Sequence, residues 1–254
     1  LIPQLLTNNA DDFIHTAKKI QQLGYQEINL NLGCPSGTVV AKGRGSGFLA
    51  KRAELDVFLE KIFNQPVVKI SVKSRIGKER PEEFDELIEI FNKYPMEELI
   101  IHPRVQTDQY KNTPNMEAFS AAFRKSKNPV CYNGDLYVKA DIDGFSNAYP
   151  SVEMVMIGRG LLMNPGLVNE VLYNVGLDKF LLKSFHDQIY DGYKRVLFGE
   201  RNVLFKMKEL WTYMILMFSD NAKHAKRIKK SQSLRDYDEA VSLLFRESEI
   251  LGVG

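Results

Sequence analysis

The chain has 254 residues, of which 44% are hydrophobic and 26% are charged, a composition typical of a folded globular protein with a sizeable core. No apolar run approaches the roughly 20 residues that a membrane-spanning helix needs, and residues 1–8 lack the features of a signal peptide. We therefore expect a cytoplasmic protein with no membrane partner. The formal net charge is only +2, yet residues 179–254 hold 14 basic against 10 acidic residues.

The first 175 residues alternate between strand-like and helix-like segments. Short apolar runs predict strands at residues 2–6, 27–32, 67–72, 98–102, 129–132 and 153–157. Apolar residues at helical spacing predict helices between them, at residues 11–23, 54–63, 81–94, 115–125 and 137–147. This alternation is typical of βαβ units that build a parallel sheet.

From residue 179 onward only helical patterns remain. Their apolar stripes, of which Leu204, Met207 and Trp211 form one, predict a small antiparallel bundle with these side chains in its core. Within this region, residues 223–235 contain six basic and no acidic residues. Such a segment is either a solvated helix face or a surface that binds a polyanion, and the sequence leaves both interpretations open.

The strand at 27–32 runs into Asn31-Leu32-Gly33-Cys34-Pro35. Its alternation sends the asparagines to one face, and the turn that follows lifts Cys34 out of the sheet. Alone, a cysteine in a cytosolic protein is more often a small buried hydrophobe than a catalyst, and Cys131, inside an apolar run, fits that role. The two cysteines show no metal-type spacing, so we expect no metal site.

Four later strands also end in polar residues, at positions 73–75, 102–104, 133–135 and 158–160. The carboxyl ends of parallel barrel strands open on one face, and that face carries the active site. The loop at 36–52 is rich in glycine and basic residues, which is typical of a flexible surface loop. Because Cys34 lies at its root, we favour a lid that closes over an extruded base.

With these motifs assembled, the chain resembles the tRNA-dihydrouridine synthase family, flavin enzymes that reduce uridine in tRNA. The segment 31–35 looks like the family's asparagine-to-cysteine motif, and segments 72–75, 102–104, 133–135 and 158–160 match its later motifs in order. The resemblance implies an FMN-binding (β/α) barrel over residues 1–175 and a helical tRNA-binding domain over residues 176–254. It also implies that the barrel is N-terminally incomplete, with six of eight strands. Pro103 replaces the family's usual glycine.

The resemblance also assigns roles. Cys34 would be the catalytic general acid that protonates C5 of the uracil after hydride reaches C6 from the flavin. Lys73 would place a positive charge beside the reduced isoalloxazine, although a salt bridge to a neighbouring strand is the simpler interpretation. The implied substrate-binding residues are Asn31, Arg75 and Arg104. The implied cofactor-binding residues are Gln4, Lys73, His102, Asn133, Asp135, Gly158 and Arg159. NADPH would be the reductant, tRNA the partner, and the protein a monomer.

Two functions of other classes stay open. One is an FMN-dependent oxidoreductase of a free pyrimidine, related to dihydroorotate dehydrogenases, which would leave the basic helical segment without a purpose. The other is a non-catalytic RNA-binding module, because a chain lacking two barrel strands need not hold a flavin. A visible absorption spectrum separates enzyme from module.

Overall fold

A computed structural model describes residues 1–251 and divides into two compact units, each considered by itself here. Unit 1 comprises residues 1–134 and 149–156, and it contains the sheet. Unit 2 comprises residues 135–148 and the chain from residue 157 onward, and it is helical. The boundary expected at residue 175 falls inside unit 2, so a functional division at that point stays a prediction.

The sheet of unit 1 has six parallel strands, and all six lie where the sequence pattern predicts them. They are β1 (Gln4–Leu5), β2 (Glu27–Leu32), β3 (Lys69–Arg75), β4 (Leu99–His102), β5 (Val130–Tyr132) and β6 (Met154–Val155). Their order in space follows their order in the chain. A doubly wound sheet reverses its strand order at a switch point, whereas a (β/α) barrel does not. The described strands therefore have the order of an α/β barrel.

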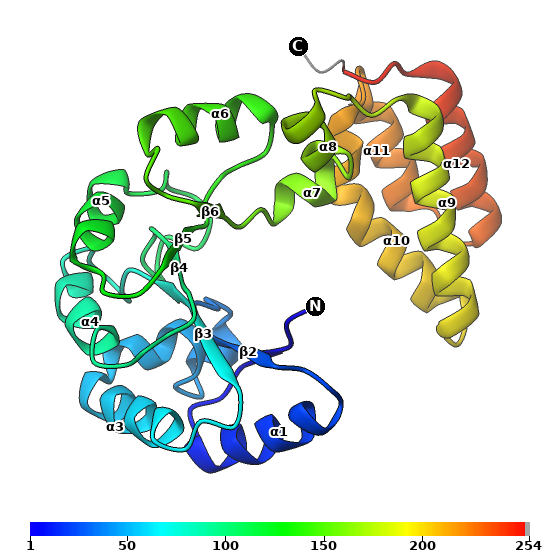
Figure 1. Ribbon diagram of the computed structural model, residues 1–254. Helices are drawn as coiled ribbons and strands as arrows, with labels where there is room; N and C mark the ends of the chain where they lie inside the picture. The colour runs from blue at the N-terminus through cyan, green and yellow to red at the C-terminus, as the bar shows by residue number, and fades with distance from the viewer. Residues whose placement is uncertain (252–254) are drawn as a thin grey trace. The chain divides into compact units, whose positions relative to one another are not determined.

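Helices connect successive strands on the outer side of the sheet (Figure 1). In unit 1 they are α1 (Ala10–Gln22), α3 (Arg52–Phe63), α4 (Glu83–Phe91) and α5 (Met116–Lys125). The Asn9 side chain caps α1 by accepting hydrogen bonds from two backbone amides, and Gly24, with φ of +93°, takes the left-handed conformation that follows the helix end. The apolar face of α1 buries Phe13 and Ala17, and the Phe13 ring packs edge-on against Phe58 of α3.

The two faces of the sheet differ in chemistry. Leu30, Val72 and Ile101 belong to the face that the helices cover, and all three side chains are fully buried. Asn29 and Lys73 alternate with them and point to the opposite face. A parallel sheet with helices on one side and polar side chains on the other has a face available for binding. This polar face is the frame of the candidate site.

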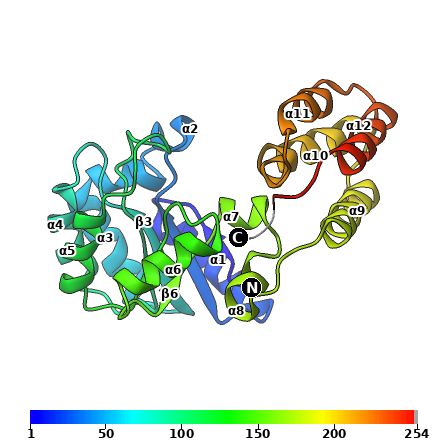
Figure 2. The same ribbon diagram turned by 90° about the horizontal axis from the view of Figure 1, so that it is seen from above.

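Unit 2 is made of helices. They are α6 (Lys139–Ala148), α7 (Arg159–Met163), α8 (Leu167–Tyr173), α9 (Lys179–Val196), α10 (Glu200–Met214), the 3₁₀ helix η2 (Ile215–Met217), α11 (Asn221–Lys230) and α12 (Leu234–Glu247). Those from α9 onward share one hydrophobic core. Figures 1 and 2 show α10, α11 and α12 side by side, and α10 contacts α9, α11 and α12. Met207 and Trp211 lie in the core, where the sequence pattern places them. No helix among the described residues is both long and apolar enough to cross a membrane.

A polar chain is buried in that core. Trp211 Nε1 donates to Tyr237 Oη at 2.7 Å, and Tyr237 Oη lies 2.6 Å from His186 Nε2. His186 Nδ1 lies 2.8 Å from a carboxylate oxygen of Asp187, which can only accept. The consistent assignment is that Nδ1 carries the proton and Nε2 accepts from the tyrosine. Burial lowers the pKa of His186, which favours this neutral form.

Replacing Tyr237 with Phe should lower the free energy of unfolding by about 1–3 kcal/mol, because it leaves two buried polar groups without a partner. Urea denaturation followed by Trp211 fluorescence measures the change. Tyr173→Phe is the matched control, since Tyr173 is 69% exposed. Equal stability of the two variants would show that the buried chain contributes nothing.

Candidate active site

On the polar face of the sheet, three side-chain amides form a connected network. Gln4 Nε2 donates to Asn29 Oδ1 at 2.7 Å, and Asn31 Nδ2 donates to Gln4 Oε1 at 2.8 Å. Asn29 Nδ2 donates in turn to Ser71 Oγ at 3.0 Å. The network joins β1, β2 and β3 and satisfies the buried Asn29 side chain. Asn29 and Ser71 were not among the predicted site residues, although the alternation of Asn29 with Asn31 indicates that they share a face.

The Cys34 backbone is fixed from both sides. Asn31 Oδ1 accepts from the amides of Gly33 and Cys34, both at 3.0 Å, in an Asx turn that ends the strand. The carbonyl oxygen of Cys34 accepts from the Ser46 amide at 3.1 Å and from Ser46 Oγ at 2.8 Å. The cysteine, half-buried, is thus held by contacts to its own backbone. The contribution of Ser46 has no signal in the sequence.

The segment after Cys34 is folded and packed. It contains the helix α2 (Gly37–Val40) and the 3₁₀ helix η1 (Gly45–Ala50), in which residues 45–49 are buried. A Cβ atom at Gly45 would lie 2.7 Å from the carbonyl oxygen of Cys34, and one at Gly47 would lie 2.8 Å from that of Val40. These glycines therefore permit close packing. The expectation of a flexible loop is therefore wrong for residues 45–49, because their burial ties them to the Cys34 turn. A lid formed by other residues of the segment 36–52 stays a prediction.

Arg75, at the end of β3, joins two loops. Its side chain is 2% exposed, and Nε donates to the carbonyl oxygen of Gly33 at 3.1 Å. Nη1 and Nη2 donate to the carbonyl oxygens of Val105 and Gln109 at 2.8 and 2.6 Å. The guanidinium also lies 5.3 Å from the ring centre of Tyr110. In this structure Arg75 therefore holds the backbone before Cys34 against the loop after β4, with its five donors largely engaged.

His102 is held between Arg104 and Asn133. Asn133 Nδ2 donates to the carbonyl oxygen of Met156, so its Oδ1, 3.2 Å from His102 Nδ1, accepts from the imidazole. Arg104 Nη1 lies 3.1 Å from His102 Nε2 and can only donate. Burial, together with the charges of Arg75 and Lys73, lowers the pKa of His102 to about 3. The imidazole is therefore neutral near pH 7.

Lys73 lies on β3 opposite Asn31 of β2 and Ile100 of β4, and it is partly buried. Within residues 1–251 no carboxylate forms an ion pair with its ammonium, so the expected alternative of a cross-strand salt bridge is not found. Burial, reinforced by the charge of Arg75, lowers the pKa of Lys73 to about 8. A desolvated cation without a counter-ion is suited to an anionic group of a ligand.

Cys131 occupies the same face as Lys73, two strands further on in β5. It is 3% exposed, and burial, followed by the nearby Glu98 charge, raises the pKa of its thiol to about 12. Burial likewise raises the pKa of Glu98. A buried thiol with this pKa is inert, which agrees with the packing role expected for Cys131.

The other predicted cofactor residues belong to unit 2 and form their own arrangement. Arg159 pairs with Asp135 at 2.8 Å, and its guanidinium lies 5.1 Å from the ring centre of Tyr137. Asp135 has a φ of +36°, while Gly158 immediately precedes α7. A Cβ atom at Gly160 would lie 2.3 Å from the carbonyl oxygen of Leu136, so only glycine permits this approach. The Gly-Arg-Gly turn is thus packed against the segment that carries Asp135.

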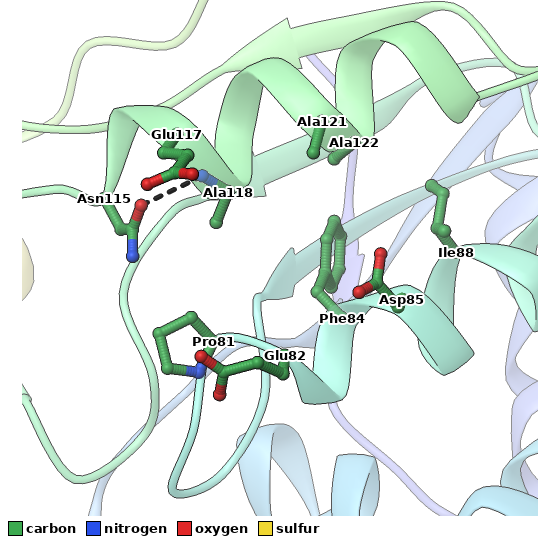
Figure 3. Close-up of a pocket in the computed structure, with 10 residues that line it drawn as sticks. All are labelled: Pro81, Glu82, Phe84, Asp85, Ile88, Asn115, Glu117, Ala118, Ala121 and Ala122. Atoms are coloured by element: carbon green, nitrogen blue, oxygen red, sulfur yellow. Dashed lines mark hydrogen bonds between the residues drawn. The ribbon is translucent and has the colours of Figure 1, made fainter.

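A separate cavity of about 220 Å³ lies between α4 and α5. Figure 3 shows Phe84, Ala118 and Ala122 on its walls and the carboxylates of Glu82 and Glu117 at its side. It contains none of the predicted site residues. Its acidic groups are of a kind that is common on exposed helix faces, and they give no separate reason to assign a function. We therefore do not assign this cavity to the site.

Comparison with known proteins places these motifs in a family. The family model described as dihydrouridine synthase matches residues 1–246. A tRNA-dihydrouridine(16) synthase of Haemophilus ducreyi is 30% identical over 182 residues, which cover 68% of this chain and 52% of that protein. One of the same name from Vibrio vulnificus is 28% identical over 67% of this chain and 54% of its own length. A probable tRNA-dihydrouridine synthase of Helicobacter pylori is 28% identical over 73% and 57%. The chain thus spans about half the length of the curated relatives it matches.

Replacing Lys73 with Met should stabilise the ligand-free protein by about 1–3 kcal/mol near pH 7, because it removes a buried cation without a counter-ion. The pKa of Lys73 is about 8 in the fold against 10.5 for a free lysine, so the unfolded chain binds more protons between these values. The parent therefore gains stability as pH rises through this window, and the advantage of the variant should shrink. Urea denaturation near pH 7 and pH 10 measures both effects. A pH-independent difference would contradict the assignment.

Replacing Arg75 with Lys should loosen the loop after β4, since one ammonium cannot serve three carbonyl groups in two loops. We expect tryptic cleavage after the exposed Lys111 to accelerate several-fold. Cleavage after Lys230, in unit 2, provides the internal control. Unchanged cleavage after Lys111 would show that the loop is held by other contacts.

Proposed function

Because the chain belongs to the dihydrouridine synthase family, we propose that it reduces uridine to 5,6-dihydrouridine in tRNA, with FMN as cofactor and NADPH as the source of electrons. The observation that carries the proposal is the fixed Cys34 turn at the end of β2, in a sheet whose polar face also holds Lys73 and His102. NADPH and a monomeric state are expectations of the family resemblance, and so is a (β/α) barrel that is N-terminally incomplete, with six of eight strands. A cytoplasmic setting is an expectation from the composition of the sequence.

The residues of unit 1 fit a flavin on one point of chemistry. Reduced FMN supplies hydride and carries negative charge at its N1–O2 edge. Lys73 is a partly buried cation without a carboxylate partner in the described chain. A bound anion would therefore be stabilised by the Lys73 ammonium and would in turn raise the pKa of Lys73, so that the lysine stays fully protonated. Gln4, Asn133 and the neutral His102 would supply hydrogen-bonding groups to the cofactor. In unit 2, we propose that Arg159, Gly158 and Asp135 serve the FMN phosphate, with Arg159 supplying the charge.

In the reaction, Cys34 would give its proton to C5 of the uracil ring. Its backbone is held by Asn31 and Ser46, so the thiol is attached to a fixed position of the main chain. Hydrogen bonds to backbone or side-chain partners already engage polar atoms of Asn31, Arg75 and Arg104. Direct contact with a uracil would require an exchange of these partners. We propose that all three act on the substrate chiefly by shaping this face.

The tRNA would meet the basic helix α11. Lys226, Lys229 and Lys230 are exposed, whereas Lys223 and Arg227 lie 3.9 Å from Glu247 and Glu239. Exposed pairs at this distance contribute little and exchange readily for phosphate contacts. The helix therefore offers a surface of one charge sign to a polyanion.

Cys34→Ala should lower the rate of uridine reduction by about 10²- to 10⁴-fold, the usual effect of losing a general acid. FMN affinity should not change, because the thiol acts on the substrate. The measurements are flavin fluorescence titration and mass spectrometry of nucleosides from an unmodified tRNA transcript. Cys131→Ala is the matched control and should retain the parent rate.

The same assays decide between the alternatives. Reduction by Cys34→Ala at close to the parent rate would remove the acid role from this residue. Turnover of a free pyrimidine but not of tRNA would favour the dihydroorotate dehydrogenase-like alternative. A colourless protein that binds tRNA without taking up FMN would be a non-catalytic RNA-binding module.

A further inference from the structure

Unit 2 has a groove between α10 and α11 that the proposed reaction does not use. Its volume is about 450 Å³, within the range of about 300–1,000 Å³ typical of small-molecule sites. The groove is lined at its base by Trp211, Ile215 and Ile228, which are between 1% and 6% exposed. Phe205, at its rim, is 69% exposed. An aromatic ring left in solvent beside an apolar hollow indicates a binding surface.

The charges around the groove select the kind of ligand. Lys208 and Lys229 line it, and α11 carries five basic residues and no acidic one. One carboxylate, that of Glu209, also lines the groove, but it pairs with Lys206 at 2.9 Å. An occupant must therefore offer a flat apolar surface to Phe205 and negative charge to α11. A nucleotide within a single-stranded part of an RNA has both, since its base stacks on aromatic rings and its phosphates pair with lysine.

We propose that this groove binds one unstacked nucleobase of the tRNA, with Phe205 as the stacking platform and α11 as the contact to the adjoining phosphates. The proposal rests on the proposed function, because it takes tRNA as the substrate. It adds a second point of attachment, separate from the uridine that is reduced. Phosphate contacts position a nucleic acid but carry no sequence information, whereas a base held in a groove can be read by its shape and its edges.

The groove contains its own reporter. Trp211 is the single tryptophan of the chain, and it lies in the groove lining. A base that enters the groove should change its fluorescence, and a polyanion without bases should not. Hexaadenylate RNA and inorganic polyphosphate are therefore the two probes, each titrated at several salt concentrations.

Three variants test the assignment with unmodified tRNA and with both probes. Phe205→Ala removes the platform, and Ala225→Leu fills the groove while leaving Phe205 in place. Phe198→Ala is the matched control, since Phe198 is 96% exposed in the same unit and outside the groove. Circular dichroism checks that each variant is folded.

We expect Phe205→Ala and Ala225→Leu to weaken tRNA binding by about 5- to 100-fold. Their salt slope should match that of the parent, because no phosphate contact is lost. Both should abolish the Trp211 response to hexaadenylate while polyphosphate binding stays the same, and Phe198→Ala should behave as the parent. Tight tRNA binding by both groove variants would overturn the groove proposal and leave the proposed function intact. Binding of a protein instead of RNA at Phe205 would also overturn only the groove proposal. Failure of the parent to bind tRNA would instead contradict the proposed function.

Discussion

The hydrogen bonds around the Gly33–Cys34 peptide determine how this site is built. The amide and the carbonyl of Gly33, and then the amide and the carbonyl of Cys34, are each bonded to Asn31, Arg75 or Ser46. These partners come from β2, β3 and η1, so the turn is fixed only when the sheet and the segment after it are folded together. A residue placed in this way needs little reorganisation when a substrate arrives, which is the physical advantage of building a site on rigid elements.

The polar face of the sheet carries a surplus of positive groups. Lys73, Arg75 and Arg104 lie on β3 or at the end of β4, and burial lowers the pKa of both Lys73 and Arg75. The Arg75 guanidinium is bonded to carbonyl oxygens, which accept hydrogen bonds without cancelling the charge. The resulting field disfavours a proton on His102 and favours an anion near Lys73. Under the proposed function, the same desolvated positive charge would stabilise a reduced, anionic cofactor on this face.

The sequence predicted the strands and helices well because their signals are local. The period-2 pattern of residues 27–32 and the helical stripe from Leu204 to Trp211 are visible without tertiary contacts. The family motifs predicted Cys34, Lys73 and His102 as parts of one site, and the sheet register places Lys73 and His102 on the same face. Gly45 and Gly47 were misread, because mobility and close packing demand the same residue and only their contacts with Cys34 and Val40 separate the two. Ser46 and the buried partners of Arg75 were not predictable, since their contacts join segments 12 to 42 residues apart.

The electrostatics of the face also narrow the choice of proton donor. His102 has both nitrogens engaged, and its pKa of about 3 leaves it without a proton to give near neutrality. Cys131 is buried and holds its proton too tightly, with a pKa raised to about 12. Lys73, with a pKa of about 8, is the serious competitor of Cys34 on this face of the described chain. An anion bound beside Lys73 would raise its pKa again, however, and so make it a poorer acid when the cofactor is reduced. Under the proposed function, the charge that suits Lys73 to hold a reduced flavin would leave proton transfer to Cys34.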